Sequence, residues 1–134
     1  MSARPTAVYL DSSALVKLVV PEPETAALRS ALGEWERHVS SALVRTEVVR
    51  ACARLGVAAR RIAERVIASL DLIAIDDAIL DAAGRLKPLE LRTLDAIHVA
   101  SAQLLGPALG GVIAYDARLI EGAEAAKLPT IVPR

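Results

Sequence analysis

The sequence has few aromatic residues and no excess of charge of either sign. It contains no phenylalanine, and only 2% of its residues are aromatic, so its hydrophobic core must be aliphatic. Stacking platforms for single-stranded nucleic acid are limited to Trp35, Tyr9 and Tyr115. The 16 basic residues equal the 16 acidic ones, which argues against a strongly basic nucleic-acid-binding protein. Any contact with nucleic acid is therefore expected to be local, or to act through bound cations.

The sequence also lacks paired cysteines and long apolar runs. Cys52 is the only cysteine, so no internal disulfide can form, which suits a reducing cytoplasm. Charged residues interrupt each apolar run well before about 18 residues, so no segment is expected to span a membrane. The first residues show no charged region followed by an apolar one, so no signal peptide is expected. Together these features predict a cytoplasmic protein.

Aliphatic residues, by contrast, are abundant. Hydrophobic residues make up 54% of the chain, which is enough for a sizeable core and argues against disorder. A length of 134 residues is typical of one domain. No linker-like, repetitive or low-complexity stretch divides the sequence. We therefore expect residues 1–134 to form a single domain.

Strand-like and helix-like segments alternate along the chain. The predicted strands are 6–10, 38–42, 71–75, 112–115 and 129–132. The predicted helices are 12–20, 23–34, 43–55, 58–70, 77–86, 93–105 and 117–126. This alternation predicts an α/β fold of three layers, in which helices cover both faces of a five-stranded parallel sheet. In such sheets, functional sites lie at the carboxyl ends of the strands.

Four acidic residues occupy positions that are informative in such a fold. Asp11 ends the first predicted strand, and Asp116 directly follows the fourth. The carboxyl ends of parallel strands meet at one edge of the sheet, so these two acids are expected to share an edge. Glu47 and Asp95 lie on predicted helices, on the faces that carry the apolar residues. An acid on an apolar face is costly unless another group offsets its charge.

A divalent cation is one explanation that accounts for all four acids. Mg²⁺ and Mn²⁺ prefer carboxylate oxygens and water, and the sequence has no cluster of histidines and cysteines that would favour zinc. Two like charges about 4 Å apart repel by roughly 1 kcal/mol in water and about 4 kcal/mol in a partly shielded site. A bound cation reverses the sign of that interaction and can activate water against a phosphate.

Each acid alone also has an ordinary structural interpretation. Asp11 is well placed to cap a helix, and Asp116 to form a turn. Glu47 has the right spacing for an ion pair with Arg50 or Arg54. The set of four acids, on these elements in this order, is a stronger indication than any one of them.

Four segments carry a family resemblance: YLDSSALVKL, SSALVRTEVVRA, RTLDAIHVASA and IAYDARLIEGAEAAKLPTIVP. They resemble the four acidic signatures of PIN-domain ribonucleases and, more narrowly, of the VapC-type toxins of VapBC toxin–antitoxin pairs. The resemblance covers roughly residues 7 to 133. It implies a five-stranded parallel sheet with helices on both sides, and a metal-dependent endoribonuclease. It also implies an RNA substrate, a cognate antitoxin of the VapB type, and a homodimer.

The resemblance assigns the metal-binding and catalytic roles to Asp11, Glu47, Asp95 and Asp116, with Ser12 as a small hydroxyl beside the first acid. These acids would bind one or two Mg²⁺ or Mn²⁺ ions, and a bound water would attack the phosphodiester. We hypothesise that Asp11 and Asp95 hold the first ion, that Glu47 binds or orients through water, and that Asp116 contributes to a second. The family commonly has a threonine two residues before the fourth acid, where this sequence has Ala114.

Other polar residues near these acids have two interpretations each. Arg92 could contact phosphate or pair with an acid, and His98 is more often a packed structural histidine than an active-site one. Arg50 and Arg54 are candidates for RNA contact at the rim of the site.

Three alternative functions fit the sequence less well. A haloacid-dehalogenase-like phosphatase needs a second aspartate where Ser13 stands, and a receiver domain needs an acid pair after the first strand. A non-catalytic PIN-like module that only binds RNA or protein stays open as the alternative, and a metal titration would distinguish it.

Overall fold

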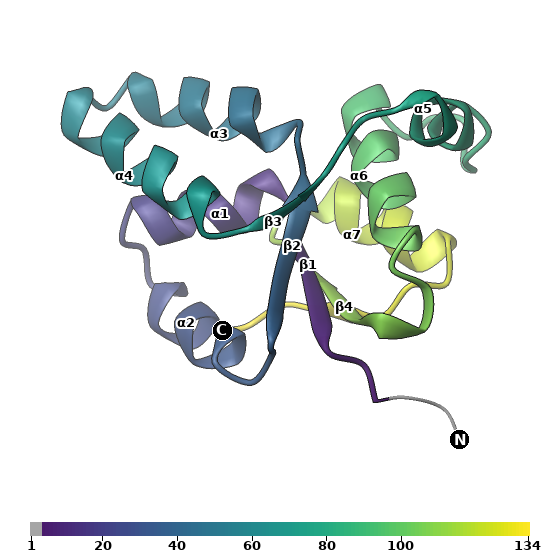
Figure 1. Ribbon diagram of the computed structural model, residues 1–134, viewed down its shortest axis with the longest axis horizontal. Coiled ribbons are helices and arrows are strands. Elements are labelled where there is room, and N and C mark those ends of the chain that lie inside the picture. Colours follow the sequence, from purple (N-terminus) through teal and green to yellow (C-terminus); the bar gives the residue numbers. More distant parts are fainter. Residues whose placement is uncertain (1–3) are drawn as a thin grey trace.

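The structure, a computed structural model, describes residues 4–134 and is built on a central parallel sheet (Figure 1). Its strands lie in the order β3-β2-β1-β4-β5, and every neighbouring pair is parallel. The strands are β1 (Ala7–Leu10), β2 (Arg37–Ser41), β3 (Asp71–Ile73), β4 (Leu109–Ile113) and β5 (Thr130–Ile131). The predicted α/β class and five-stranded parallel sheet are thus confirmed.

Helices cover both faces of this sheet, as Figure 1 shows, with α1 to α4 on one side and α5 to α7 on the other. The helices are α1 (Ser12–Val19), α2 (Thr25–Leu32), α3 (Val44–Ala53), α4 (Val57–Ala68), α5 (Asp77–Gly84), α6 (Thr93–Gln103) and α7 (Ala117–Ala125). A short 3₁₀ helix, Gly106–Ala108, leads into β4. None of the helices described is long and apolar enough to cross a membrane.

Strand β1 is the centre of the core because it carries apolar side chains on both faces. Val8 and Leu10 pack with helices α1 to α4, whereas Ala7 and Tyr9 pack with α6 and α7. This is the alternation of side chains expected along a strand that is covered on both sides. The strand is fully buried, so the residue that follows it, Asp11, emerges at the carboxyl edge of the sheet from the middle of the molecule.

The predicted position of the fourth strand was wrong by two to three residues. Strand β4 includes Gly110 and Gly111, which lie outside the predicted strand 112–115. Both glycines face large side chains: a Cβ on Gly110 would lie 2.1 Å from the Trp35 ring, and one on Gly111 would lie 2.6 Å from Ile131. The strand therefore needs glycine for close packing, a use that does not show in a sequence pattern.

The shifted strand also moves the fourth acid relative to the sheet. Because β4 ends at Ile113, Asp116 does not follow the strand directly but stands at the end of a short loop, as the residue before α7. The second predicted helix likewise begins at Thr25 and not at Pro23, after a turn closed by the Thr25 amide and the Glu22 carbonyl. The other element boundaries lie within a few residues of their predicted positions.

Candidate active site

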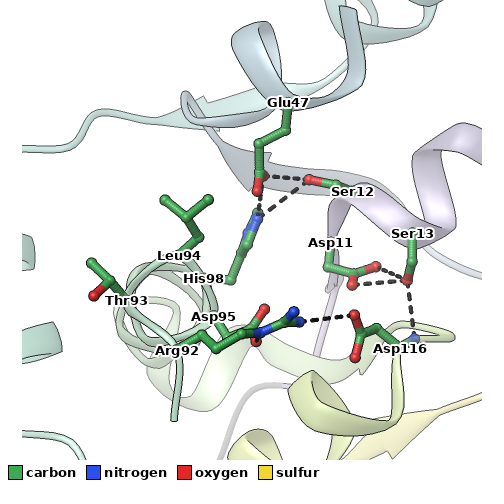
Figure 2. Close-up of a pocket in the computed structure, with 10 residues that line it drawn as sticks. All are labelled: Asp11, Ser12, Ser13, Glu47, Arg92, Thr93, Leu94, Asp95, His98 and Asp116. Atoms are coloured by element: carbon green, nitrogen blue, oxygen red, sulfur yellow. Dashed lines mark hydrogen bonds and ion pairs between the residues drawn. The ribbon is translucent and has the colours of Figure 1, made fainter. Parts of the chain in front are cut away.

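A pocket of about 410 Å³ opens at the carboxyl edge of the sheet (Figure 2). It gathers residues from four segments that are far apart in the sequence. Its lining residues are Asp11, Ser12, Ser13, Glu47, Arg92, Thr93, Leu94, Asp95, His98 and Asp116. All four acids predicted from the sequence therefore meet in one cavity, together with the predicted supporting residues Ser12 and Arg92.

Asp11 lies between β1 and α1 and is almost fully buried, with 4% of its surface exposed. It caps α1 by accepting a hydrogen bond from the Ala14 amide at 3.0 Å, so the capping interpretation holds alongside the active-site one. The Ser13 hydroxyl lies 2.7 and 2.8 Å from its two carboxylate oxygens. Burial raises the pKa of Asp11 to about 6, although these hydrogen bonds lower it in part, and the nearby charge of Asp116 raises it further.

Ser13 connects the first acid with the loop that carries the fourth. Besides donating to Asp11, its hydroxyl oxygen accepts hydrogen bonds from the backbone amides of Tyr115, at 2.9 Å, and Asp116, at 3.3 Å. The missing hydroxyl at Ala114 thus does not leave this loop unsupported, since Ser13 holds it from the first turn of α1. The sequence did not single out Ser13, because its role depends on a contact across 102 residues.

Arg92 bridges the third and fourth acids. Its Nε lies 2.9 Å from Asp95 Oδ2, and its terminal nitrogen lies 3.1 Å from Asp116 Oδ2 (Figure 2). Of the two roles that the sequence left open, the structure shows the pairing with acids. The other oxygen of Asp116 accepts from the Arg118 amide at 2.8 Å and so caps α7. One exposed guanidinium therefore offsets two carboxylates at the mouth of the pocket.

Glu47 is half-buried on the first turns of α3. Two polar side chains of the pocket, those of His98 and Ser12, hold its carboxylate. His98 Nε2 lies 2.8 Å from Glu47 Oε1, and the Ser12 hydroxyl donates to the same oxygen (Figure 2). Burial raises the pKa of Glu47, but the hydrogen bonds from His98 and Ser12 outweigh it, so the pKa lies below its ordinary value.

The predicted alternative of an ion pair between Glu47 and an arginine of α3 is wrong. Within residues 4–134, neither Arg50 nor Arg54 forms a salt bridge. Both are exposed and line a shallow groove next to Glu47, of about 580 Å³. They therefore remain free of acidic partners at the rim of the pocket.

His98 is the functional candidate that sequence reasoning undervalued. Only 2% of its surface is exposed, yet it lines the pocket. Its Nδ1 lies 2.7 Å from the hydroxyl of Tyr9, a fully buried residue of β1. Burial raises the pKa of that hydroxyl above its ordinary value, so Tyr9 keeps its proton. The signal that could have identified His98 is its place three residues after Asp95, on the same face of α6.

The residues present fit a hard divalent cation. The pocket offers carboxylate oxygens and no thiolate, and the buried carboxylate of Asp11 has no ion-pair partner among residues 4–134. The guanidinium of Arg92 between two of the acids shows that this part of the pocket accommodates positive charge. The acids do not form a closed cage, since nowhere in residues 4–134 do three metal-ligating side chains lie close enough to hold one ion.

Comparisons with known proteins identify the family of the chain. The family model described as PIN domain matches residues 8–125. The chain is 51% identical to a protein named Ribonuclease VapC46 from Mycobacterium tuberculosis, over 95% of this chain and 98% of that protein. It is 35% identical to Ribonuclease VapC47 of the same species, over 94% and 96%.

Two solved structures share the fold. One is described as a toxin–antitoxin complex from Klebsiella pneumoniae, with a TM-score of 0.73 and 20% identity over 95% of this chain and 98% of that one. The other is VapC20 of Mycobacterium tuberculosis, described as a sarcin–ricin loop cleaving toxin, with a TM-score of 0.72 and 16% identity over 94% and 99%.

Replacing Asp11 with asparagine should stabilise the metal-free protein in a pH-dependent way. A carboxyl whose pKa is raised from 3.8 to about 6 on folding favours the folded state when protonated, so its ionisation lowers stability as the pH rises from about 4 to 7. Two units of pKa correspond to about 3 kcal/mol at neutral pH. Urea unfolding in EDTA should therefore show Asp11→Asn to be more stable than the wild type at pH 7, with little difference at pH 4.

The exposed Asp81 of α5 provides the matched control. Asp81→Asn should change the free energy of unfolding by a similar small amount at both pH values. An advantage of Asp11→Asn that is the same at pH 4 and pH 7 would contradict the role assigned to the buried charge.

Proposed function

Because the chain belongs to the PIN-domain family, we propose that it is a metal-dependent endoribonuclease and the toxin of a type II toxin–antitoxin pair. One observation carries the proposal: four acids from distant segments converge in one pocket at the carboxyl edge of the sheet. The relatives named as VapC ribonucleases support the same activity over nearly the whole chain.

We assign the following roles to the residues of the pocket. Asp11 and Asp95 would hold the first Mg²⁺ or Mn²⁺, Asp116 would contribute to a second, and Glu47 would bind or orient through water. When bound, such an ion lowers the pKa of a coordinated water and neutralises the phosphate. Ser13 and the Ala14 amide fix the carboxylate of Asp11 in place. Arg92, half-exposed beside two of the acids, is placed to donate to a phosphate oxygen.

The energetic cost of Asp11 argues against a non-catalytic module. An uncompensated carboxylate in a buried position destabilises the metal-free fold, and asparagine would cap α1 equally well. A protein that only binds RNA or another protein gains nothing from this charge. A cation that neutralises Asp11 accounts for it.

We propose that RNA reaches the pocket across α3. Arg50 and Arg54 lie one and two turns beyond Glu47, and the groove that they line adjoins the pocket. Their exposed guanidinium groups suit contacts with phosphates, which position RNA without reading its sequence. With a net charge of zero over the whole chain, such a local basic surface matters more than the overall field.

The proposed partners are RNA, an antitoxin of the VapB type and a second copy of the chain, in the cytoplasm. The similar Klebsiella pneumoniae structure is a toxin–antitoxin complex, which supports the antitoxin as a partner. For the homodimer, the supporting feature is an apolar groove between α5, α6 and the segment that joins them. Its exposed leucines are Leu80 and Leu89. Monomeric proteins seldom expose contiguous apolar surface of this kind.

Purified protein should cut cellular RNA into discrete fragments in Mn²⁺ or Mg²⁺ and leave it intact in EDTA. Asp11→Asn should lower the rate at least roughly a hundredfold, because it removes part of the charge that holds the cation. Gel analysis of the RNA, with mapping of the fragment ends, measures both effects. Since the same substitution is expected to stabilise the metal-free fold, a loss of activity cannot be assigned to unfolding.

Two results would contradict this function. Cleavage that persists in EDTA, or in Asp11→Asn, would show that the pocket is not the source of the activity. RNA that stays intact in every condition, with Mn²⁺ binding preserved, would favour the non-catalytic module.

Removing both arginines of the α3 groove should weaken RNA binding more than it slows the reaction. For Arg50→Gln with Arg54→Gln, we expect a higher KM for RNA and a nearly unchanged kcat. The dependence of log affinity on log salt should become shallower by about 0.7 for each phosphate that the variant no longer binds. The matched control is Arg61→Gln with Arg65→Gln on α4. It removes the same charge from exposed residues that line neither the pocket nor the α3 groove. Equal effects of the two double variants would contradict the proposed path.

In sedimentation equilibrium, the chain without antitoxin should have twice its mass of 14.1 kDa. Leu89→Glu should shift the mass toward that of one chain, because it places a charge in the apolar groove. Leu55, exposed at the end of α3, provides the control, and Leu55→Glu should leave the dimer intact. A wild-type protein that stays monomeric at all accessible concentrations would exclude the homodimer.

A further inference from the structure

A chain of three hydrogen-bonded side chains runs from the core of the sheet to the pocket. The Tyr9 hydroxyl lies 2.7 Å from His98 Nδ1, and His98 Nε2 lies 2.8 Å from Glu47 Oε1. The rings of Tyr9 and His98 meet edge to face, with centroids 5.8 Å apart. The three residues come from β1, α6 and α3, so the chain ties together the central strand and a helix from each layer.

The donors and acceptors in this chain have a direction. A carboxylate only accepts hydrogen bonds, so His98 Nε2 must carry the proton that it shares with Glu47. In the neutral imidazole, Nδ1 then accepts, and the Tyr9 hydroxyl donates to it. The hydroxyl therefore fixes which nitrogen of His98 faces the carboxylate as a donor.

Both donors to Glu47 converge on one oxygen. His98 Nε2 and the Ser12 hydroxyl are both bonded to Oε1, whereas Oε2 has no hydrogen-bond partner among residues 4–134. One oxygen of the carboxylate is thus held in place, and the other is left for a ligand. Figure 2 shows the carboxylate of Glu47 directed into the pocket above His98.

We propose that Tyr9 and His98 are positioning residues of the active site, which orient the Glu47 carboxylate so that Oε2 serves the divalent cation or its water. The inference rests on the proposed function and concerns how this chain prepares one of its acids. Partners in the outer shell of a metal site commonly fix the orientation of the ligands in this way, and their loss typically costs about 10- to 100-fold in metal affinity or activity.

A purely structural role explains the chain less well. Tyr9 and His98 are both almost fully buried, in a core whose large side chains are otherwise aliphatic. Burying polar groups there gives no advantage in packing over an apolar pair of similar size, and it requires every partner to be in place. The hydrogen-bonded chain ends at Glu47, an acid of the pocket, and this explains why Tyr9 and His98 are buried together.

The test measures Mn²⁺ affinity, by the electron paramagnetic resonance signal of the free ion, for the full-length wild type, Tyr9→Phe, His98→Leu and His98→Gln. We expect the dissociation constant to rise roughly tenfold or more in His98→Leu, and by less in Tyr9→Phe. His98→Gln should recover much of the affinity, because an amide nitrogen near the position of Nε2 can still donate to Glu47. With RNA, kcat should fall and KM should stay unchanged.

Tyr115→Phe is the matched control for the loss of a hydroxyl. The Tyr115 hydroxyl donates to the backbone carbonyl of Pro133 at 2.8 Å, away from the acids. Its removal should leave the Mn²⁺ affinity at the wild-type value. Should His98→Leu fail to fold, as judged by thermal unfolding in EDTA, the comparison of Tyr9→Phe with Tyr115→Phe decides the question.

The outcomes separate this inference from the proposed function. If the wild type binds Mn²⁺ and cuts RNA, and Asp11→Asn loses both, the function stands. In that case, wild-type affinity and kcat in Tyr9→Phe and in folded His98 variants would overturn the positioning role alone, as would equal effects of Tyr9→Phe and Tyr115→Phe. A wild type that neither binds Mn²⁺ nor cuts RNA would overturn both.

Discussion

The arrangement of the site depends on the carboxylate of Asp11, which is buried at the end of the central strand. It lies at the carboxyl edge of the sheet because it directly follows β1, a strand in the middle of the core. Burial makes its charge unfavourable, as its raised pKa shows, and hydrogen bonds from Ser13 and the Ala14 amide offset only part of the cost. A group of positive charge is the one addition that turns this cost into binding energy.

The other three acids have partners among the side chains of the protein, and these partners are of two kinds. Arg92 serves both Asp95 and Asp116, and its exposed side chain can leave them without disturbing the core. Glu47 is held by His98, which is buried and supported from behind by Tyr9. Arg92 can therefore be displaced from its acids, whereas His98 is held in place. An arriving cation would therefore replace Arg92, whereas His98 would keep its place beside Glu47.

Those parts of the fold and site that depend on local sequence were predictable. The alternation of apolar strands and amphipathic helices indicated the class, and the acids at the ends of strands indicated the edge that carries the pocket. Strand β4 was misplaced because the need for Gly110 arises from the ring of Trp35, 75 positions earlier in the chain. For the same reason, the contacts of Ser13 and His98 could not be predicted, since their partners lie 102 and 51 residues away. Local patterns carry information on burial and periodicity, but not on which distant atom completes a hydrogen bond.

The distribution of the compensating groups predicts where a cation gains most. At Asp95 and Asp116 it competes with Arg92, and at Glu47 it meets an oxygen whose neighbour already accepts two hydrogen bonds. At Asp11 it meets a carboxylate with no ionic partner in residues 4–134, whose burial leaves its charge weakly screened. In the proposed metal site, most of the electrostatic gain on binding would therefore arise at Asp11. The remaining acids would complete the coordination and set its geometry, so the residues that hold them rigidly would matter as well as their charge.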